Sequence, residues 1–141
     1  MEENSFGDFI FPNGEEYSGS YSGFQRSGQG KQLLCNKLIY IGEWKDNKYE
    51  GYGRQYNPEF KKFKSISSNI YRNLNLLTNE NWKSYIGEFK RGKWHGRGTL
   101  LLSNGFKLNG EFYKNRVHGK GSVISQNGTF IVIGEYVHNE I

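Results

Sequence analysis

Two histidines share one position in a repeated motif and are the first candidates for chemistry. His95 lies in YIGEFKRGKWHGRG, and His118 lies in LNGEFYKNRVHGKG, 23 residues further on. A zinc site or a general base requires partners that converge on the ring, and no cysteine or carboxylate recurs beside these histidines at ligand spacing. The sequence therefore predicts loop residues of a repeat, with no metal or cofactor site.

Carboxylates recur in the same way. They occupy one position of successive motifs, as Glu43, Glu88, Glu111 and Glu135. Paired acids are a common catalytic device, but no nucleophile, base and orienting group accompany them here. A repeated carboxylate is typical of a structural brace that pairs with Lys or Arg or accepts turn amides. We therefore expect a protein without catalytic residues, and not an enzyme.

The elements that position these residues follow from a period of 23 residues. Five motifs align at this period, with 24 residues in the last interval: YSGSY at Tyr17, YIGEW at Tyr40, YIGEF at Tyr85, LNGEF at Leu108 and VIGEY at Val132. Asn-Gly pairs recur near the end of the unit, at Asn13, Asn104 and Asn127, and predict tight hairpin turns with positive φ. The pattern predicts antiparallel hairpins that are too small to bury a core alone and must stack on their neighbours.

The domain organisation follows from this phase. We expect a single array over residues 1–141, with units near 7–16, 17–39, 40–56, 85–107, 108–131 and 132–141. Residues 57–84 lack the pattern, and no glycine occurs between residues 54 and 86. The spacing favours a decayed hairpin pair there, and the alternative is a long loop or short helix inserted between hairpins.

Composition agrees with an aromatic β-structure. Hydrophobic residues make up 35% and aromatic residues 16% of the chain, with nineteen glycines, which is typical of short strands and turns. Cys35 is the single cysteine, so no intramolecular disulfide forms, and the N-terminal sequence lacks a signal-peptide pattern. These features predict an intracellular protein, cytoplasmic or associated with the cytoskeleton or a cilium, or else part of an organelle complex.

The motif Y-x-G-E-[WF]-x-x-[GN]-x-x-x-G-x-G resembles the MORN repeat (membrane occupation and recognition nexus). The resemblance covers about residues 7–56 and 85–136, with departures at Ser20, Lys37, Leu108 and Val132. It implies an all-β fold, an elongated single-layer antiparallel meander of stacked hairpins. It also implies a non-enzymatic module with roles in phospholipid binding, dimerisation or capture of a partner's segment.

An aromatic ladder is the first candidate binding surface. Its members recur at one position of each unit, as Tyr21, Trp44, Phe89, Phe112 and Tyr136. A one-layer sheet cannot cover both of its own faces, so part of this ladder is expected to remain open as a shallow groove. Such a groove would suit an amphipathic helix or an extended segment of a protein partner in a larger complex.

A basic stripe is the second candidate surface. It comprises Lys90, Arg91, Lys93 and Arg97 in one unit and Lys114, Arg116 and Lys120 in the next. Stacking is expected to align these residues, and anionic phospholipid would attract them. The alternative is that they form a solvated loop edge.

Residues 1–30 carry five acids against Arg26, so the array has an acidic start. Nucleic acid is not expected as a partner, and the strand VIGEY offers an edge for a homodimer.

Overall fold

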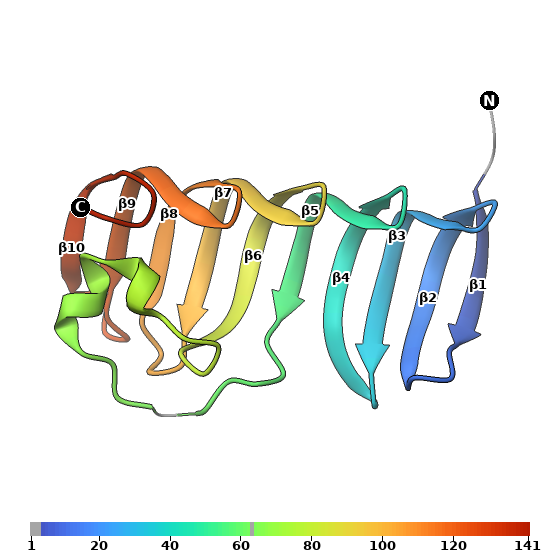
Figure 1. Cartoon of the computed structure of the whole chain (residues 1–141), viewed down its shortest axis with the longest axis horizontal. Coiled ribbons are helices and arrows are strands. Elements are labelled where there is room, and N and C mark those ends of the chain that lie inside the picture. The colour runs from blue at the N-terminus through green and yellow to red at the C-terminus, as the bar shows by residue number, and fades with distance from the viewer. Residues whose placement is uncertain (1–3, 63) are drawn as a thin grey trace.

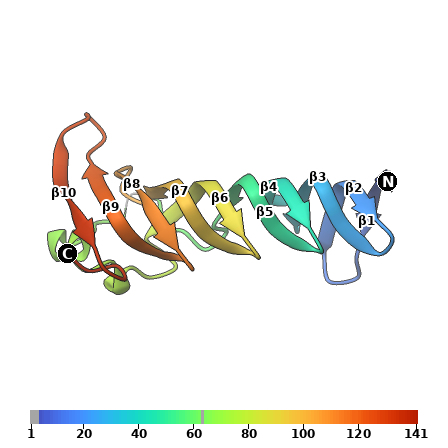
Figure 2. The ribbon, with the colours of Figure 1, turned by 90° about the horizontal axis from the view of Figure 1, so that it is seen from above.

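The chain folds into one open β-sheet in which every strand lies beside its neighbours in sequence. The computed structural model describes residues 4–62 and 64–141. Its ten antiparallel strands are β1 (Ser5–Ile10), β2 (Glu15–Ser22), β3 (Gln25–Leu34), β4 (Lys37–Lys45), β5 (Lys48–Tyr56), β6 (Trp82–Lys90), β7 (Lys93–Leu102), β8 (Lys107–Tyr113), β9 (Arg116–Ile124) and β10 (Phe130–Tyr136). They form an elongated ribbon with β1 and β10 at opposite ends (Figure 1), and the view from above shows its twist (Figure 2). The predicted all-β meander is confirmed.

A line of glycines crosses the whole sheet. Neighbouring strands place these glycines opposite one another, in the order Gly7, Gly19, Gly30, Gly42, Gly53, Gly87, Gly98, Gly110, Gly121 and Gly134. Strands β2, β4, β6, β8 and β10 begin a unit, and we call them first-type strands. Strands β3, β5, β7 and β9 complete a unit, and we call them second-type strands. β1 is also a second-type strand, because its glycine occupies the same repeat position.

The glycine row makes room for tyrosine rings that lie across it. The Tyr85 hydroxyl donates to the Glu88 carbonyl at 2.9 Å, and Tyr17 and Tyr40 make the equivalent bond in their own hairpins. A Cβ added at Gly98 would fall far inside van der Waals contact of the Tyr85 ring and hydroxyl. Burial raises the pKa of Tyr85, so its hydroxyl stays protonated as a donor. Tyrosine and glycine are therefore a matched pair within each of these hairpins.

The same rings form the core of the ribbon. Tyr40 stacks on Tyr49 with ring centroids 3.8 Å apart and meets Trp44 and Phe89 edge-on at 5.1 and 5.3 Å. Edge-on and stacked pairs contribute about 0.5–1.5 kcal/mol each beyond the area that they bury. The pKa of Tyr49 is raised to about 12, and burial of its hydroxyl is the largest cause. Tyr40 thus touches rings of its own unit and of the next one, and Trp44 touches Tyr17 of the preceding unit, so the units stabilise one another.

The repeated glutamates brace a bulge in each hairpin. The Glu88 carboxylate accepts the Arg97 backbone N–H at 2.5 Å, and Glu43 accepts the Tyr52 N–H at the same distance. The register shifts beside both carboxylates, where Gly96 adopts a φ of 89° that favours glycine. The two glutamates were expected to accept turn amides or to pair with Lys or Arg. Their amide donors, Tyr52 and Arg97, instead lie within strands β5 and β7.

Both kinds of turn follow local chemistry. The glycines of the predicted Asn-Gly turns, Gly14, Gly105 and Gly128, have φ values of 85° to 88°, as expected. The turns inside the units lie on the other long edge of the ribbon, where an asparagine side-chain oxygen accepts a backbone N–H of the preceding unit. These pairs are Asn47 with Arg26, Asn115 with Trp94 and Asn139 with Val117, at 2.7 to 2.8 Å. Side chains therefore join successive units at their tips.

Residues 57–84 contain an inserted segment, and the favoured hypothesis of a decayed hairpin pair is wrong. β5 pairs directly with β6, with Gly53 opposite Gly87, so the sheet continues without a gap. The described residues between these strands hold only two short 3-10 turns, η1 (Ser68–Tyr71) and η2 (Leu74–Leu76), and Phe63 lies outside the described residues. We call residues 57–81 the strap. Neither turn is long and apolar enough to cross a membrane.

The strap lies against the C-terminal hairpins (Figures 1 and 2). Tyr71 is buried there, and its carbonyl accepts the Tyr136 hydroxyl at 2.5 Å while its own hydroxyl accepts from Asn104 at 2.9 Å. The Leu74 N–H donates to the Asn139 carbonyl at 2.8 Å. The strap thus supplies the apolar side chains that cover the aromatic face over β8 to β10.

Candidate interaction surfaces

The predicted aromatic groove is the packed core of the sheet. Trp44, Phe89, Phe112 and Tyr136 are each 5% exposed or less, and only Tyr21 is half-buried. The strap covers one end of this face, and the rings of adjoining units cover one another along the rest. The expected open groove along these five residues is therefore absent, and the four buried rings contribute packing.

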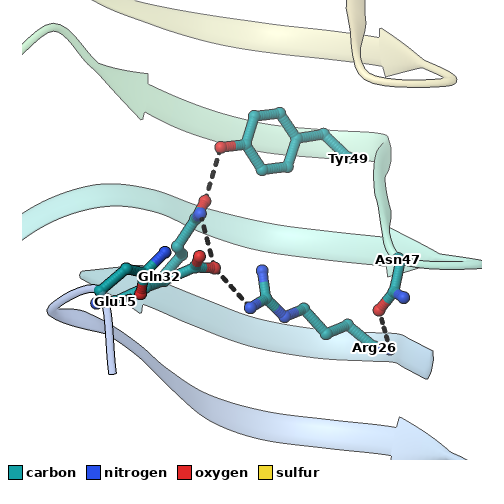
Figure 3. Close-up of polar contacts among 6 residues, drawn as sticks. Glu15, Arg26, Gln32, Asn47 and Tyr49 are labelled. Carbon is teal, nitrogen blue, oxygen red and sulfur yellow. Dashed lines mark hydrogen bonds and ion pairs between the residues drawn. The ribbon is translucent and has the colours of Figure 1, made fainter. Parts of the chain in front are cut away.

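An arginine closes the aromatic face at its N-terminal end. The Arg26 guanidinium lies over the rings of Tyr17 and Trp44, 4.9 and 5.1 Å from their centroids, and pairs with the Glu15 carboxylate. Gln32 donates to Glu15 at 3.0 Å and accepts the Tyr49 hydroxyl at 2.6 Å, as Figure 3 shows. Both charged side chains are about one-fifth exposed. This network joins the hairpins β2–β3 and β4–β5, where the strap does not reach.

The opposite face of the sheet carries an open groove. Its volume is about 1300 Å³, and it spans β5 to β10. Exposed and half-buried apolar side chains line it, among them Tyr52, Tyr56, Ile86, Leu101 and Ile133. Tyr52 and Ile133 are 61% and 70% exposed. This surface has both the size and the apolar area to hold a segment of another protein.

The charges of the groove are uneven. Its cations are Arg54, Lys83, Arg97, Lys107 and Lys120, and its acids are Glu88, Glu111 and Glu135. The Glu88 carboxylate is already engaged by the Arg97 backbone N–H, which reduces its capacity to bind a partner. The groove therefore favours an apolar segment that carries acidic side chains.

Sequence reasoning did not identify the apolar residues of the groove. Tyr52, Ile86 and Thr99 occupy strand positions that alternate with the glycine row and so face away from the tyrosines. Period-two alternation could have assigned them to a separate face. That signal is present in the sequence, but the choice of the exposed face depends on which face the strap covers.

The predicted basic stripe divides between two surfaces. Lys90, Arg91, Lys93, Lys114 and Arg116 lie at the hairpin tips on one long edge of the ribbon. Arg97 and Lys120 lie within strands and line the groove on the open face. Five of the seven cations therefore lie at two neighbouring hairpin tips, the β6–β7 turn and the β8–β9 turn. The other two lie apart from the tips, in the groove.

The histidines lie on the tip side of the sheet and form no metal site in the structure. His95 lies 5.2 Å from the Tyr113 ring, and the rings of His118 and His138 lie 4.5 Å apart. The His118 Nδ1 accepts the His138 backbone N–H at 3.2 Å, which fixes the turn of the last hairpin. Over residues 4–62 and 64–141, no three His, Cys, Asp or Glu side chains converge to hold a metal ion.

A family model for the MORN repeat matches three stretches of the chain, residues 40–58, 85–106 and 109–130. These stretches correspond to the hairpins β4–β5, β6–β7 and β8–β9. No curated protein matches the chain.

Proposed function

Because the chain is a MORN-repeat protein, and such repeats are interaction modules for proteins and membranes, we propose that it is a non-enzymatic scaffold subunit of a larger assembly. It holds a segment of a partner protein along the groove of its open face. The observation that carries this proposal is the pairing of an apolar groove of about 1300 Å³ with an excess of cations.

The groove chemistry defines the partner segment. Tyr52, Ile86 and Leu101 offer apolar contacts along the floor, and Arg97 and Lys107 flank them. An amphipathic helix or extended segment with one apolar side and acidic flanks matches both features. Buried apolar area supplies most of the binding free energy, whereas the charges set orientation and association rate.

Site-specific photocrosslinking tests the groove. A photoreactive phenylalanine analogue at Tyr52 is expected to crosslink to a protein partner in cells, because that side chain lies in the groove and is 61% exposed. The matched control is the same analogue at Phe24, which is fully exposed at the β2–β3 turn, outside the groove. Adding Arg97→Glu and Lys107→Glu to the Tyr52 variant should abolish the crosslink. Equal crosslinking from both positions, or a crosslink that survives charge reversal, would contradict the proposal.

Binding of anionic phospholipid is a second candidate function, and the clustering of five cations at adjacent hairpin tips favours it. Residues near a membrane surface contribute about 1 kcal/mol per Lys or Arg to attraction by anionic lipid, and salt weakens this attraction. The tip cluster lies on the edge of the ribbon, so it can approach a flat surface without involving the groove.

Vesicle sedimentation separates the two surfaces. Reversal of Lys90, Arg91 and Lys93 to Glu should weaken binding to phosphatidylserine-containing vesicles by about 3 kcal/mol or more, from the contribution of about 1 kcal/mol per cation. The control reverses Arg97, Lys107 and Lys120 in the groove, with the same change in net charge, and should retain most of the binding. Equal loss in both variants, or no wild-type binding at physiological salt, would exclude a lipid site at the tips.

A further inference from the structure

The two edges of the sheet are open and are of different type. β1 is a second-type strand and β10 is a first-type strand, and each pairs with one neighbour only. In the described part of the chain, no turn or loop forms a backbone hydrogen bond with Ser5–Ile10 or Phe130–Tyr136. Nine strand spacings of about 4.8 Å separate these edges, roughly 43 Å in all, so they cannot meet within one copy.

We infer that β10 of one copy pairs with β1 of the next, which joins two half-complete units into a whole hairpin. Every other first-type strand has a second-type strand on its later side, with glycine opposite glycine, as Gly42 faces Gly53. Gly134 opposite Gly7 of the next copy extends the glycine row across the junction. The two strands run in opposite directions, because strand direction alternates along the sheet, so the added pair is antiparallel.

The side chains at the two edges fit this register. Val132 would lie opposite Phe9 of the next copy, and Ile133 opposite Asp8, by analogy with Tyr40–Gln55 and Ile41–Arg54. Phe9 and Ile133 are 38% and 70% exposed, and the junction would cover both. Open apolar edge strands are a template for pairing with another chain.

Glu135 in β10 lacks the backbone partner that the equivalent glutamates have, and this supports the same junction. Glu43 and Glu88 each accept a backbone N–H from the second strand of their hairpin, at Tyr52 and Arg97. Glu135 occupies the same repeat position in β10 and has no such strand beside it. In the proposed register its carboxylate would accept the N–H of Phe6 from the next copy.

The charges at the two ends of the sheet favour contact of β1 with β10 over contact of two identical edges. Residues 4–22 carry three acids, Asp8, Glu15 and Glu16, and no cation, whereas residues 107–136 carry four cations and two acids. Glu2 and Glu3, which add to the acidic start in the sequence, lie outside the described residues. Contact of β1 with β1 would therefore oppose acid to acid, and contact of β1 with β10 would not. Such a heterologous contact need not close, so copies can add in series.

Two edge variants test the junction in sedimentation velocity with the whole chain. Wild type should form species larger than a dimer as its concentration rises. Phe6→Glu places a second carboxylate beside Glu135 of the other copy, and Ile133→Glu places one opposite Asp8, so each variant alone should be monomeric. Both side chains are largely exposed, and unchanged circular dichroism checks that each variant is folded.

Mixing the variants gives the decisive result. Each retains one intact edge of the required type, so an equimolar mixture should form a one-to-one dimer and stop there. Ile133→Lys is the matched control and should retain association, because lysine can pair with Asp8. A wild-type monomer at every concentration would overturn the inference. A wild-type dimer that persists in the Phe6→Glu variant would also overturn it, because it would indicate contact between two β10 edges.

Discussion

Replacing Gly98 with alanine should destabilise the protein by about 3 kcal/mol, the upper end of the cost of overpacking a core. The added methyl would occupy the space of the Tyr85 ring and hydroxyl, and the rings of Trp94 and Phe112 pack against Tyr85 and oppose its displacement. Displacing the ring also removes the hydrogen bond to the Glu88 carbonyl, which contributes about a further 1 kcal/mol. Urea denaturation followed by tryptophan fluorescence measures the loss.

Two further variants isolate the cause. Gly134→Ala lies in the same glycine row, but its methyl would meet only the flexible end of Ile141, so the cost should be below about 1 kcal/mol. In a Tyr85→Leu background, Gly98→Ala should add little to the loss, because the ring that it displaces is gone. This coupling should amount to about 1–3 kcal/mol. Additive losses would show that the glycine row is not required for close approach of the tyrosine.

Replacing Tyr71 with alanine should have an equally large effect, about 4 kcal/mol, as expected for removal of a buried aromatic ring. Tyr71 is 3% exposed, stacks on Phe106 with ring centroids 5.7 Å apart, and is hydrogen-bonded through its hydroxyl to Asn104. Without the ring, the strap loses its main apolar contact with the last hairpins. Thermal denaturation gives the overall loss, and hydrogen exchange locates it.

Tyr71→Phe is the matched control for the ring. It keeps the ring and removes one hydrogen bond, so the cost should be about 1 kcal/mol. Exchange should accelerate in residues 64–81 and 136–141 of the alanine variant while β1 to β4 remain protected. A loss below about 1 kcal/mol for Tyr71→Ala, with unchanged exchange, would show that the strap is not part of the folding unit.

The sequence was sufficient for the hairpins because their determinants are local and repeated. Asn104-Gly105 predicts its own turn, and the period places Gly87 opposite Gly98. The strap could not be predicted in this way. Tyr71 finds its partners at Asn104 and Tyr136, 33 and 65 residues away, and a contact made once leaves no period in the sequence.

The candidate surfaces were predicted in part. The cations at Lys90 and Lys114 were correctly expected to lie in neighbouring hairpins, because their spacing equals nearly one repeat. The aromatic ladder was identified as a set, but its burial depends on the strap and on Arg26, which are outside the repeat pattern. Both faces of the sheet carry aromatic residues, so composition alone did not distinguish the core from the groove.

The contacts of the strap lead us to expect two folding units in the ribbon. Contacts of β1 to β4 are with strands close in sequence, so these hairpins can form early and fray from the β1 edge. The strap ties residues 71–75 to residues 136–141, which closes a loop of about 65 residues around β6 to β10. We expect the C-terminal half to fold later and to open all at once, since its closure must await the last hairpin. An array of near-identical repeats thereby acquires a cooperative end and an independently melting end.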